Sequence, residues 1–169
     1  MIWWRPRLRV LFVCTANVCR SPLAEALLRH RLRALGLQRR VAVASAGTRV
    51  GQPGRPPDPR LRKLALEAGF TLGRIRARQL TPAMLAENDH VLVMEPVHLE
   101  ELAALCAGSD QLAKARLLGD CESSLTPAAA AIPDPYFSDW QGFCAVYERI
   151  EAALDLLVSN LLVELDTQA

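Results

Sequence analysis

The segment near the start of this chain constrains its fold more than any other. It consists of a short apolar strand, then a polar loop, then a helix that begins with proline. Residues 8–13 read Leu-Arg-Val-Leu-Phe-Val, which suits a buried strand. From Pro22 to Leu35 the apolar residues recur at helical spacing, and Gly36 follows as a C-cap. A second apolar run covers residues 41–46. This order predicts a βαβ unit with parallel strands.

The alternation of strand and helix continues along the chain. Residues 47–57 form a loop rich in Gly and Pro, and Asp58-Pro59 then caps a helix that stops at Gly69. The further expected elements are a helix from Thr81-Pro82 to Glu87, a strand at 89–94, a helix at 96–107, a strand at 115–118, a loop at 119–133 and a helix from about Trp140 to near the end. We therefore expect an α/β fold in which a doubly wound, four-stranded parallel sheet carries helices on both faces.

Length and composition limit the other possibilities. The 169 residues suffice for one domain, so residues 1–169 are expected to form it, with 1–7 as a tail. The 20 Lys and Arg nearly balance the 18 Asp and Glu, which gives no reason to expect a nucleic-acid partner. No apolar run is long enough for membrane insertion, and no secretory signal opens the chain. Five scattered cysteines indicate reduced thiols and a cytoplasmic protein. Trp3 and Trp4 are read as a frayed tail, a cap on the first strand or a small docking patch.

The loop after the first strand carries the residues for a reaction. Cys14 and Arg20 are separated by five residues, and the loop leads into a helix N-terminus, whose N–H groups and dipole favour an oxyanion and a thiolate. A five-residue loop can wrap its backbone N–H groups around three phosphate oxygens, while Arg20 adds a two-pronged donor and Ser21 a hydrogen bond to the thiolate. The expected phosphate-binding residues are Thr15, Ala16, Asn17, Val18, Cys19, Arg20 and Ser21. The alternative is that Cys14 is a buried strand-end thiol and Arg20 an exposed helix residue.

Two residues within this loop have further interpretations. Asn17 tolerates a left-handed backbone conformation, and its amide can brace a tight loop. Cys19 is either a packing residue or the partner of Cys14 in a protective disulfide.

We expect no metal and no cofactor, because no Cys or His pair has ligand spacing and no glycine-rich nucleotide motif is present. The three histidines, His30, His90 and His98, are assigned to helix surfaces or strand starts.

A proton donor is expected on a second loop. Ligands of parallel sheets sit beyond the carboxyl ends of the strands, so the loops after the first, second and fourth strands should meet at one edge. Asp134 lies between two prolines in the last of these loops. It is read as a general acid or as an ordinary turn residue. Tyr136 and Phe137 form the wall of an aromatic slot or, alternatively, pack in the core.

Four motifs resemble the low-molecular-weight protein tyrosine phosphatase family. Residues 11–25, Leu-Phe-Val-Cys-Thr-Ala-Asn-Val-Cys-Arg-Ser-Pro-Leu-Ala-Glu, resemble its phosphate loop and helix start. Residues 45–48, 57–60 and 134–136 resemble three further motifs in the same order. The resemblance implies a cysteinyl-phosphate mechanism with Cys14 as nucleophile, Arg20 binding phosphate and Asp134 as general acid and then base. It also implies that the loop is supported by Asn17, Ser21 and Ser45.

The resemblance extends to a branch of the family and shows departures from it. Residues 78–82 and 91–95 are similar to the bacterial members that dephosphorylate tyrosine autokinases of capsule and exopolysaccharide export, which implies such a tyrosine-phosphorylated partner. Val18 resembles the aliphatic residue of tyrosine-directed members, where the related arginine phosphatases have Thr. Ala16 stands where the family usually has Gly, and residues 49–54 lack the aromatic that many members place beside the substrate.

The leading hypothesis is therefore a metal-independent phosphotyrosine phosphatase. Two alternatives stay open. An arsenate reductase on the same fold would need further cysteines as a relay, for which Cys106 and Cys121 are the candidates. A non-catalytic phosphoprotein-binding module would use the same loop without turnover.

Overall fold

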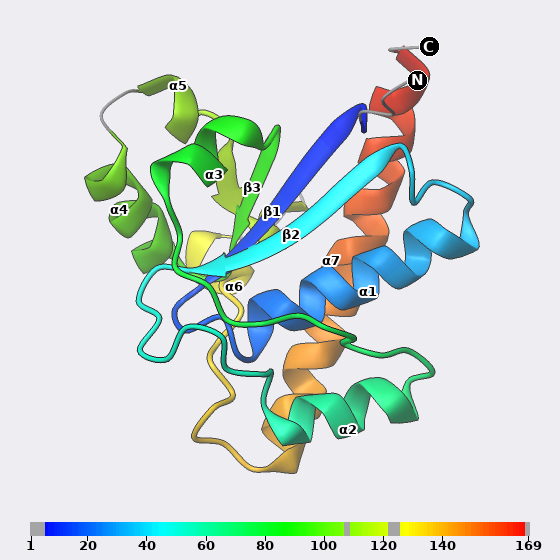
Figure 1. Ribbon diagram of the computed structural model, residues 1–169, viewed down its shortest axis with the longest axis vertical. Coiled ribbons are helices and arrows are strands. Elements are labelled where there is room, and N and C mark those ends of the chain that lie inside the picture. The colour runs from blue at the N-terminus through cyan, green and yellow to red at the C-terminus, as the bar shows by residue number, and fades with distance from the viewer. Residues whose placement is uncertain (1–5, 107–108, 122–125, 168–169) are drawn as a thin grey trace.

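The structure is a computed structural model that describes residues 6–106, 109–121 and 126–167 (Figure 1). Its centre is a four-stranded parallel sheet in the order β2-β1-β3-β4. The strands are β1 (Leu8–Cys14), β2 (Val41–Gly47), β3 (His90–Val93) and β4 (Ala115–Leu117). In this register Cys14 lies opposite Gly47, and Val13 lies opposite Val93. The predicted α/β class and sheet are confirmed, while Trp3 and Trp4 lie outside the described residues.

Helices cover both faces of the sheet. On one face lie α1 (Arg20–Ala34), α2 (Pro59–Glu67) and the long α7 (Trp140–Thr167). On the other lie α3 (Pro82–Glu87), α4 (Pro96–Leu105), α5 (Ser109–Leu112) and α6 (Pro127–Ala130). Alternate side chains of β1 enter the two cores: Val10 and Phe12 face α1 and α7, whereas Leu11 and Val13 face the second set. None of the described helices, α7 included, is long and apolar enough to cross a membrane.

Local signals place the helix ends as the sequence predicts. The Asp58 side chain accepts a hydrogen bond from the Arg60 amide at 2.8 Å, which caps α2. Thr81 caps α3 by accepting from the Met84 amide. Gly36 and Gly69 follow α1 and α2 with positive φ, a conformation that glycine adopts without strain. The start of α1 differs from the prediction: the helix begins at Arg20 instead of Pro22, so the arginine lies inside it.

The region after β3 departs most from expectation. The helix α4 ends at Leu105, and α5 lies in a segment for which no element was predicted. The expected loop at 119–133 is instead interrupted by the 3-10 helix η1 (Leu118–Cys121) and by α6. A Cβ at Gly119 would lie 2.1 Å from the Ala130 carbonyl oxygen, so glycine permits α6 to pack against η1. These pieces are four residues long, too short to show a hydrophobic period.

Candidate active site

The candidate site lies at the carboxyl edge of β1 and β2. A pocket of about 330 Å³ opens there. Its walls come from the Cys14 loop, the Gly- and Pro-rich loop and the loop before α7, namely Cys14, Thr15, Ala16, Val18, Cys19, Arg20, Gly51, Gln52, Arg55, Asp134, Tyr136 and Phe137. The Thr48 amide donates to the Cys14 carbonyl and the Arg49 amide to the Thr15 carbonyl, both at 2.9 Å, which ties two of the loops together. The predicted meeting of these loops is therefore observed.

Asn17 braces the Cys14 loop from beneath. It is 0% exposed, and with φ of 55° it is the one non-glycine residue in the described parts of the chain that has a positive φ. Its Nδ2 donates to Ser21 Oγ at 2.8 Å and to Ser45 Oγ at 2.9 Å, and its Oδ1 accepts from the Arg78 amide at 3.0 Å. The left-handed position thus falls on Asn17 and not on Ala16, so the loop turns without a glycine at residue 16.

Ser21 connects this brace to the thiol. Its Oγ lies 3.0 Å from Cys14 Sγ and 3.3 Å from the Ala46 carbonyl oxygen. Since Asn17 Nδ2 already donates to Ser21 Oγ, the hydroxyl hydrogen is available to the sulfur or to that carbonyl. A sulfur that carries negative charge attracts that hydrogen, so the arrangement can stabilise a thiolate.

Arg20 is buried, which rules out the alternative of an exposed helix residue. Its side chain is 1% exposed. Nη1 donates to Glu95 and, at 2.9 Å, to the Ile132 carbonyl, while Nη2 donates to Asp134 Oδ2 at 2.8 Å. Nε is buried without a hydrogen-bond partner among the described residues. Arg20 lines the pocket, its guanidinium is held in place, and one of its N–H groups has no acceptor among the described residues. Such a group can bind an oxyanion.

Sequence reasoning missed Glu95 and His98. His98 was assigned to a surface position, and this was wrong because its side chain is 0% exposed. The Glu95 amide donates to His98 Nδ1 at 3.1 Å, so the ring proton resides on Nε2, which lies 3.0 Å from Thr15 Oγ1 and donates to it. Burial and the nearby Arg20 charge lower the pKa of His98, which keeps it neutral. The sequence does contain one indication that Glu95 and His98 belong to the site: they follow β3 directly, and the end of β3 lies at the same sheet edge as Cys14.

Asp134 and the two aromatic residues close the other side of the pocket. Asp134 has a 43% exposed side chain, and its Oδ1 accepts from the Tyr136 amide at 3.1 Å. The segment is held by Arg60 of α2, which donates to the Tyr136 carbonyl at 2.9 Å and pairs with Asp58. The Phe137 ring is 97% exposed and meets the half-buried Tyr136 ring edge-on at 5.0 Å. Core packing is therefore excluded for Phe137, and both rings line the pocket.

The cysteines differ in environment. Cys14, Cys19, Cys106 and Cys144 are free thiols. Burial and the carboxylates of Asp58 and Asp134 raise the pKa of Cys19. Cys106, a relay candidate, packs in the core on the other face of the sheet from Cys14, and the side chain of Cys121 lies outside the described part of the structure. Within the described residues, no group of three or more His, Cys, Asp or Glu is placed to hold a metal ion.

Comparison with known proteins gives consistent matches over most of the chain. The family model described as "Low molecular weight phosphotyrosine protein phosphatase" matches residues 9–168. A low molecular weight protein-tyrosine-phosphatase of Streptomyces coelicolor is 34% identical over 95% of this chain and 98% of its own. A protein tyrosine phosphatase of Entamoeba histolytica, solved with Hepes in its active site, superposes with a TM-score of 0.85 at 27% identity, covering 93% of this chain and 98% of its own. Vibrio vulnificus Wzb, solved with benzylphosphonate, superposes with a TM-score of 0.79 at 28% identity, covering 91% and 99%.

Proposed function

The chain belongs to the low molecular weight phosphotyrosine protein phosphatase family of hydrolases, and we propose that it removes phosphate from tyrosine through a phosphorylated Cys14. The observation that carries the proposal is that Cys14, Arg20 and Asp134 line one pocket, with Ser21 Oγ 3.0 Å from the Cys14 sulfur. Since the site draws on residues from Cys14 to Phe137, we also propose that the whole chain of 169 residues acts as a single domain.

In the first step the Cys14 thiolate attacks phosphorus. A sulfur–phosphorus bond forms, and the bond from phosphorus to the tyrosine oxygen breaks. The loop N–H groups and Arg20 bind the phosphate oxygens, where charge builds in the transition state. Asp134, as a carboxylic acid, gives its proton to the leaving tyrosine oxygen. In the structure Asp134 pairs with Arg20 Nη2 at 2.8 Å. When phosphate binds, its oxygens would accept the hydrogen bond from Nη2, which would free the Asp134 carboxyl group to approach the leaving oxygen.

In the second step water attacks the phosphorylated cysteine. The Asp134 carboxylate accepts a proton from that water, the sulfur–phosphorus bond breaks, and inorganic phosphate leaves. The thiolate that departs accepts a hydrogen bond from Ser21, whose hydroxyl is already oriented by Asn17. Ser21 thereby lowers the energy of the leaving sulfur. No metal is required at either step of this scheme.

Substitution of the nucleophile tests the role of Cys14. Cys14→Ser should lower hydrolysis of p-nitrophenyl phosphate by more than about 1,000-fold, while binding of an oxyanion such as vanadate survives. Cys144→Ser is the matched control, because Cys144 is a half-buried thiol of α7 that does not line the pocket. It should retain activity within about twofold. Wild-type turnover by Cys14→Ser would refute the mechanism.

For the substrate we propose phosphotyrosine carried by a protein, in particular a bacterial tyrosine autokinase of exopolysaccharide export, with the enzyme acting in the cytoplasm. Support comes from the similarity of residues 78–82 and 91–95 to that branch and from the likeness to Wzb. Tyr136 and Phe137 supply an aromatic wall for the substrate ring, and the aliphatic Val18 lines the same pocket. A cytoplasmic location would keep the Cys14 thiol reduced.

A panel of peptides tests this specificity. Catalytic efficiency should be highest on phosphotyrosine peptides and much lower on phosphoserine and phosphoarginine peptides. Phe137→Ala should lower kcat/KM for phosphotyrosine peptides without abolishing hydrolysis, since its exposed ring contributes binding area and no chemistry. Higher efficiency on phosphoarginine than on phosphotyrosine would contradict the proposed substrate class.

A further inference from the structure

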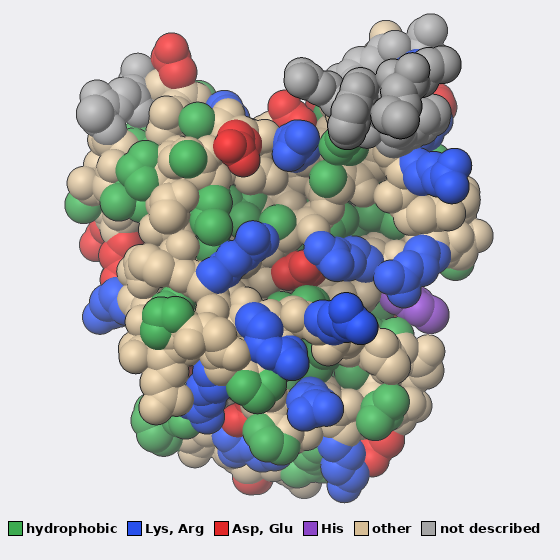
Figure 2. All heavy atoms as spheres, in the orientation of Figure 1, with side chains coloured by type: hydrophobic (Ala, Val, Ile, Leu, Met, Phe, Trp, Pro, Cys, Tyr) green, Lys and Arg blue, Asp and Glu red, His purple; other side chains and the backbone are tan. Residues whose placement is uncertain are grey.

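A second pocket, remote from the thiol, is lined largely by arginine. It has a volume of about 430 Å³ and lies between α1 and the segment that joins α2 to α3. Its charged lining consists of five arginines and one carboxylate: Arg29, Arg33, Arg74, Arg76, Arg78 and Glu25. Among the described residues, none that lines this pocket also lines the catalytic pocket. Figure 2 shows Lys and Arg side chains gathered over the middle of the face that presents α1 and α2.

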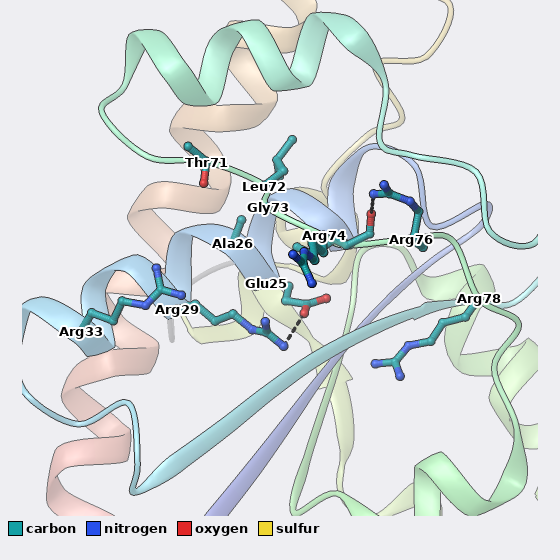
Figure 3. Close-up of a pocket in the computed structure, with 11 residues that line it drawn as sticks. Glu25, Ala26, Arg29, Arg33, Thr71, Leu72, Gly73, Arg74, Arg76 and Arg78 are labelled. Atoms are coloured by element: carbon teal, nitrogen blue, oxygen red, sulfur yellow. Dashed lines mark hydrogen bonds and ion pairs between the residues drawn. The ribbon is translucent and has the colours of Figure 1, made fainter.

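Three of the five arginines form hydrogen bonds or ion pairs, and one of these is Arg76, whose Nη1 donates to the neighbouring Ile75 carbonyl at 2.8 Å. Arg29 pairs with Glu25 at 2.7 Å and donates to the Val43 carbonyl at 2.7 Å, and Arg78 Nε donates to the Ser45 carbonyl at 2.7 Å. In contrast, the guanidinium groups of Arg33 and Arg74 form no hydrogen bond or ion pair with another described residue, and both side chains are exposed. In Figure 3 Arg29, Arg74 and Arg78 lie around the Glu25 carboxylate.

The charges in this pocket do not balance. Five guanidinium groups against one carboxylate leave a net charge of +4. Like charges that line one pocket repel one another, and a bound anion reduces that repulsion. Guanidinium groups also match the geometry of phosphate oxygens, which they bind in pairs of parallel hydrogen bonds. The volume falls within the range of small-ligand pockets and exceeds the space that a single phosphate fills.

We infer that this pocket is a binding site for a small, multiply charged phosphate compound, an oligophosphate, separate from the catalytic pocket. Contacts with the protein orient Arg29 and Arg78, whereas Arg33 and Arg74 are available to pair with the ligand. Glu25 is the one acidic side chain in the lining and opposes the ligand.

Glu25 also joins the pocket to the catalytic loop. Its Oε2 accepts from Ser45 Oγ at 2.5 Å, and Ser45 Oγ accepts from Asn17 Nδ2 at 2.9 Å. The pocket therefore contacts the hydrogen-bonded brace that ends at Ser21 and Cys14. A ligand that pairs with Arg29 competes with Glu25 for that guanidinium, and Glu25 is two hydrogen bonds from Asn17.

Calorimetric titration with inorganic tripolyphosphate tests the site directly. The titration is run on the whole protein with the catalytic pocket filled by saturating benzylphosphonate, so its result does not depend on turnover. We expect one tripolyphosphate to bind per chain. The double variant Arg33→Ala/Arg74→Ala should weaken this binding at least tenfold, and Glu25→Gln should strengthen it, because Gln keeps the acceptor for Ser45 and removes the negative charge.

The matched control removes two exposed cations elsewhere. Arg9→Ala/Arg62→Ala makes the same change in net charge at positions that do not line the pocket, and it should weaken binding less than threefold. Equal weakening by the two double variants, or no binding once the catalytic pocket is filled, would overturn the inference. Tighter binding of citrate than of tripolyphosphate would overturn the assignment to phosphate. Since all four arginines are exposed, unchanged melting temperatures should confirm that each variant folds.

Discussion

Replacing Asn17 by alanine should destabilise the fold and disable the catalytic loop together. The substitution removes three hydrogen bonds made by a fully buried side chain, to Ser21, Ser45 and the Arg78 amide. It also places alanine at φ of 55°, where a Cβ is strained. These two effects are separable, because glycine at the same position loses the hydrogen bonds and relieves the strain.

The size of the effect follows from these contacts. Each hydrogen bond contributes a net of about 0.5–1.5 kcal/mol, so their loss costs about 1.5–4.5 kcal/mol in free energy of unfolding. Left-handed strain adds about 1 kcal/mol for alanine. Glycine avoids this strain, but it also gains entropy in the unfolded chain. The free energies of unfolding of Asn17→Ala and Asn17→Gly should therefore differ by only about 0.5 kcal/mol. Displacement of the loop by about 1 Å should lower kcat roughly 100-fold in both variants.

Urea unfolding and kcat on p-nitrophenyl phosphate measure the two effects. Asn88→Ala is the matched control, since Asn88 is also a buried asparagine, and its side chain donates to the Met84 carbonyl of α3, away from the catalytic loop. It should lose about 1 kcal/mol and keep its activity. If Asn17→Ala is no less stable than Asn88→Ala and retains wild-type kcat, Asn17 does not brace the loop.

Three further substitutions test other parts of the site. Asp134→Asn should lower turnover more for phenyl phosphate than for p-nitrophenyl phosphate and remove the basic limb of the pH profile; equal losses on both substrates would exclude Asp134 as the acid. Because burial lowers the pKa of His98, the unfolded chain binds a proton below about pH 6.5 that the folded protein does not, so stability should fall as pH decreases through that window. His98→Gln should flatten this dependence in urea unfolding, and an unchanged slope would count against a buried neutral imidazole. Hydrogen peroxide should oxidise the Cys14 thiolate to a sulfenic acid, from which the Cys19 thiol displaces water to form a disulfide. Cys19→Ser should then recover less activity in dithiothreitol than the wild type, whereas equal recovery would argue against the disulfide.

The parts of the fold set by local signals could be predicted from the sequence. Apolar periodicity located the four strands and the long helix α7, and side-chain caps located the starts of α2 and α3. In contrast, α5, η1 and α6 are too short for periodicity, and η1 and α6 also depend on packing against each other, where Gly119 closely approaches Ala130.

The same distinction applies to the site. The Cys14 loop is contiguous in sequence, and parallel-sheet geometry brought Asp134 to it. The burial of Arg20 was not predictable, because its acceptors come from two distant segments: Glu95 follows β3, while Ile132 and Asp134 lie in the loop before α7. For His98 the sequence shows a polar residue in a helix that starts at the sheet edge of Cys14, and the packing of α4 turns its side chain toward Thr15.

Trapping the phosphorylated Cys14 intermediate is the most direct test of the proposed two-step mechanism. The variant Asp134→Ala, which lacks the base for the second step, is mixed with an aryl phosphate that has a good leaving group and is quenched in acid within milliseconds. Mass spectrometry should find one added phosphoryl group, on the peptide that contains Cys14, and none in Cys14→Ser/Asp134→Ala. Steady hydrolysis with no phosphorylated cysteine at any quench time, and with full activity in Cys14→Ser, would contradict the account.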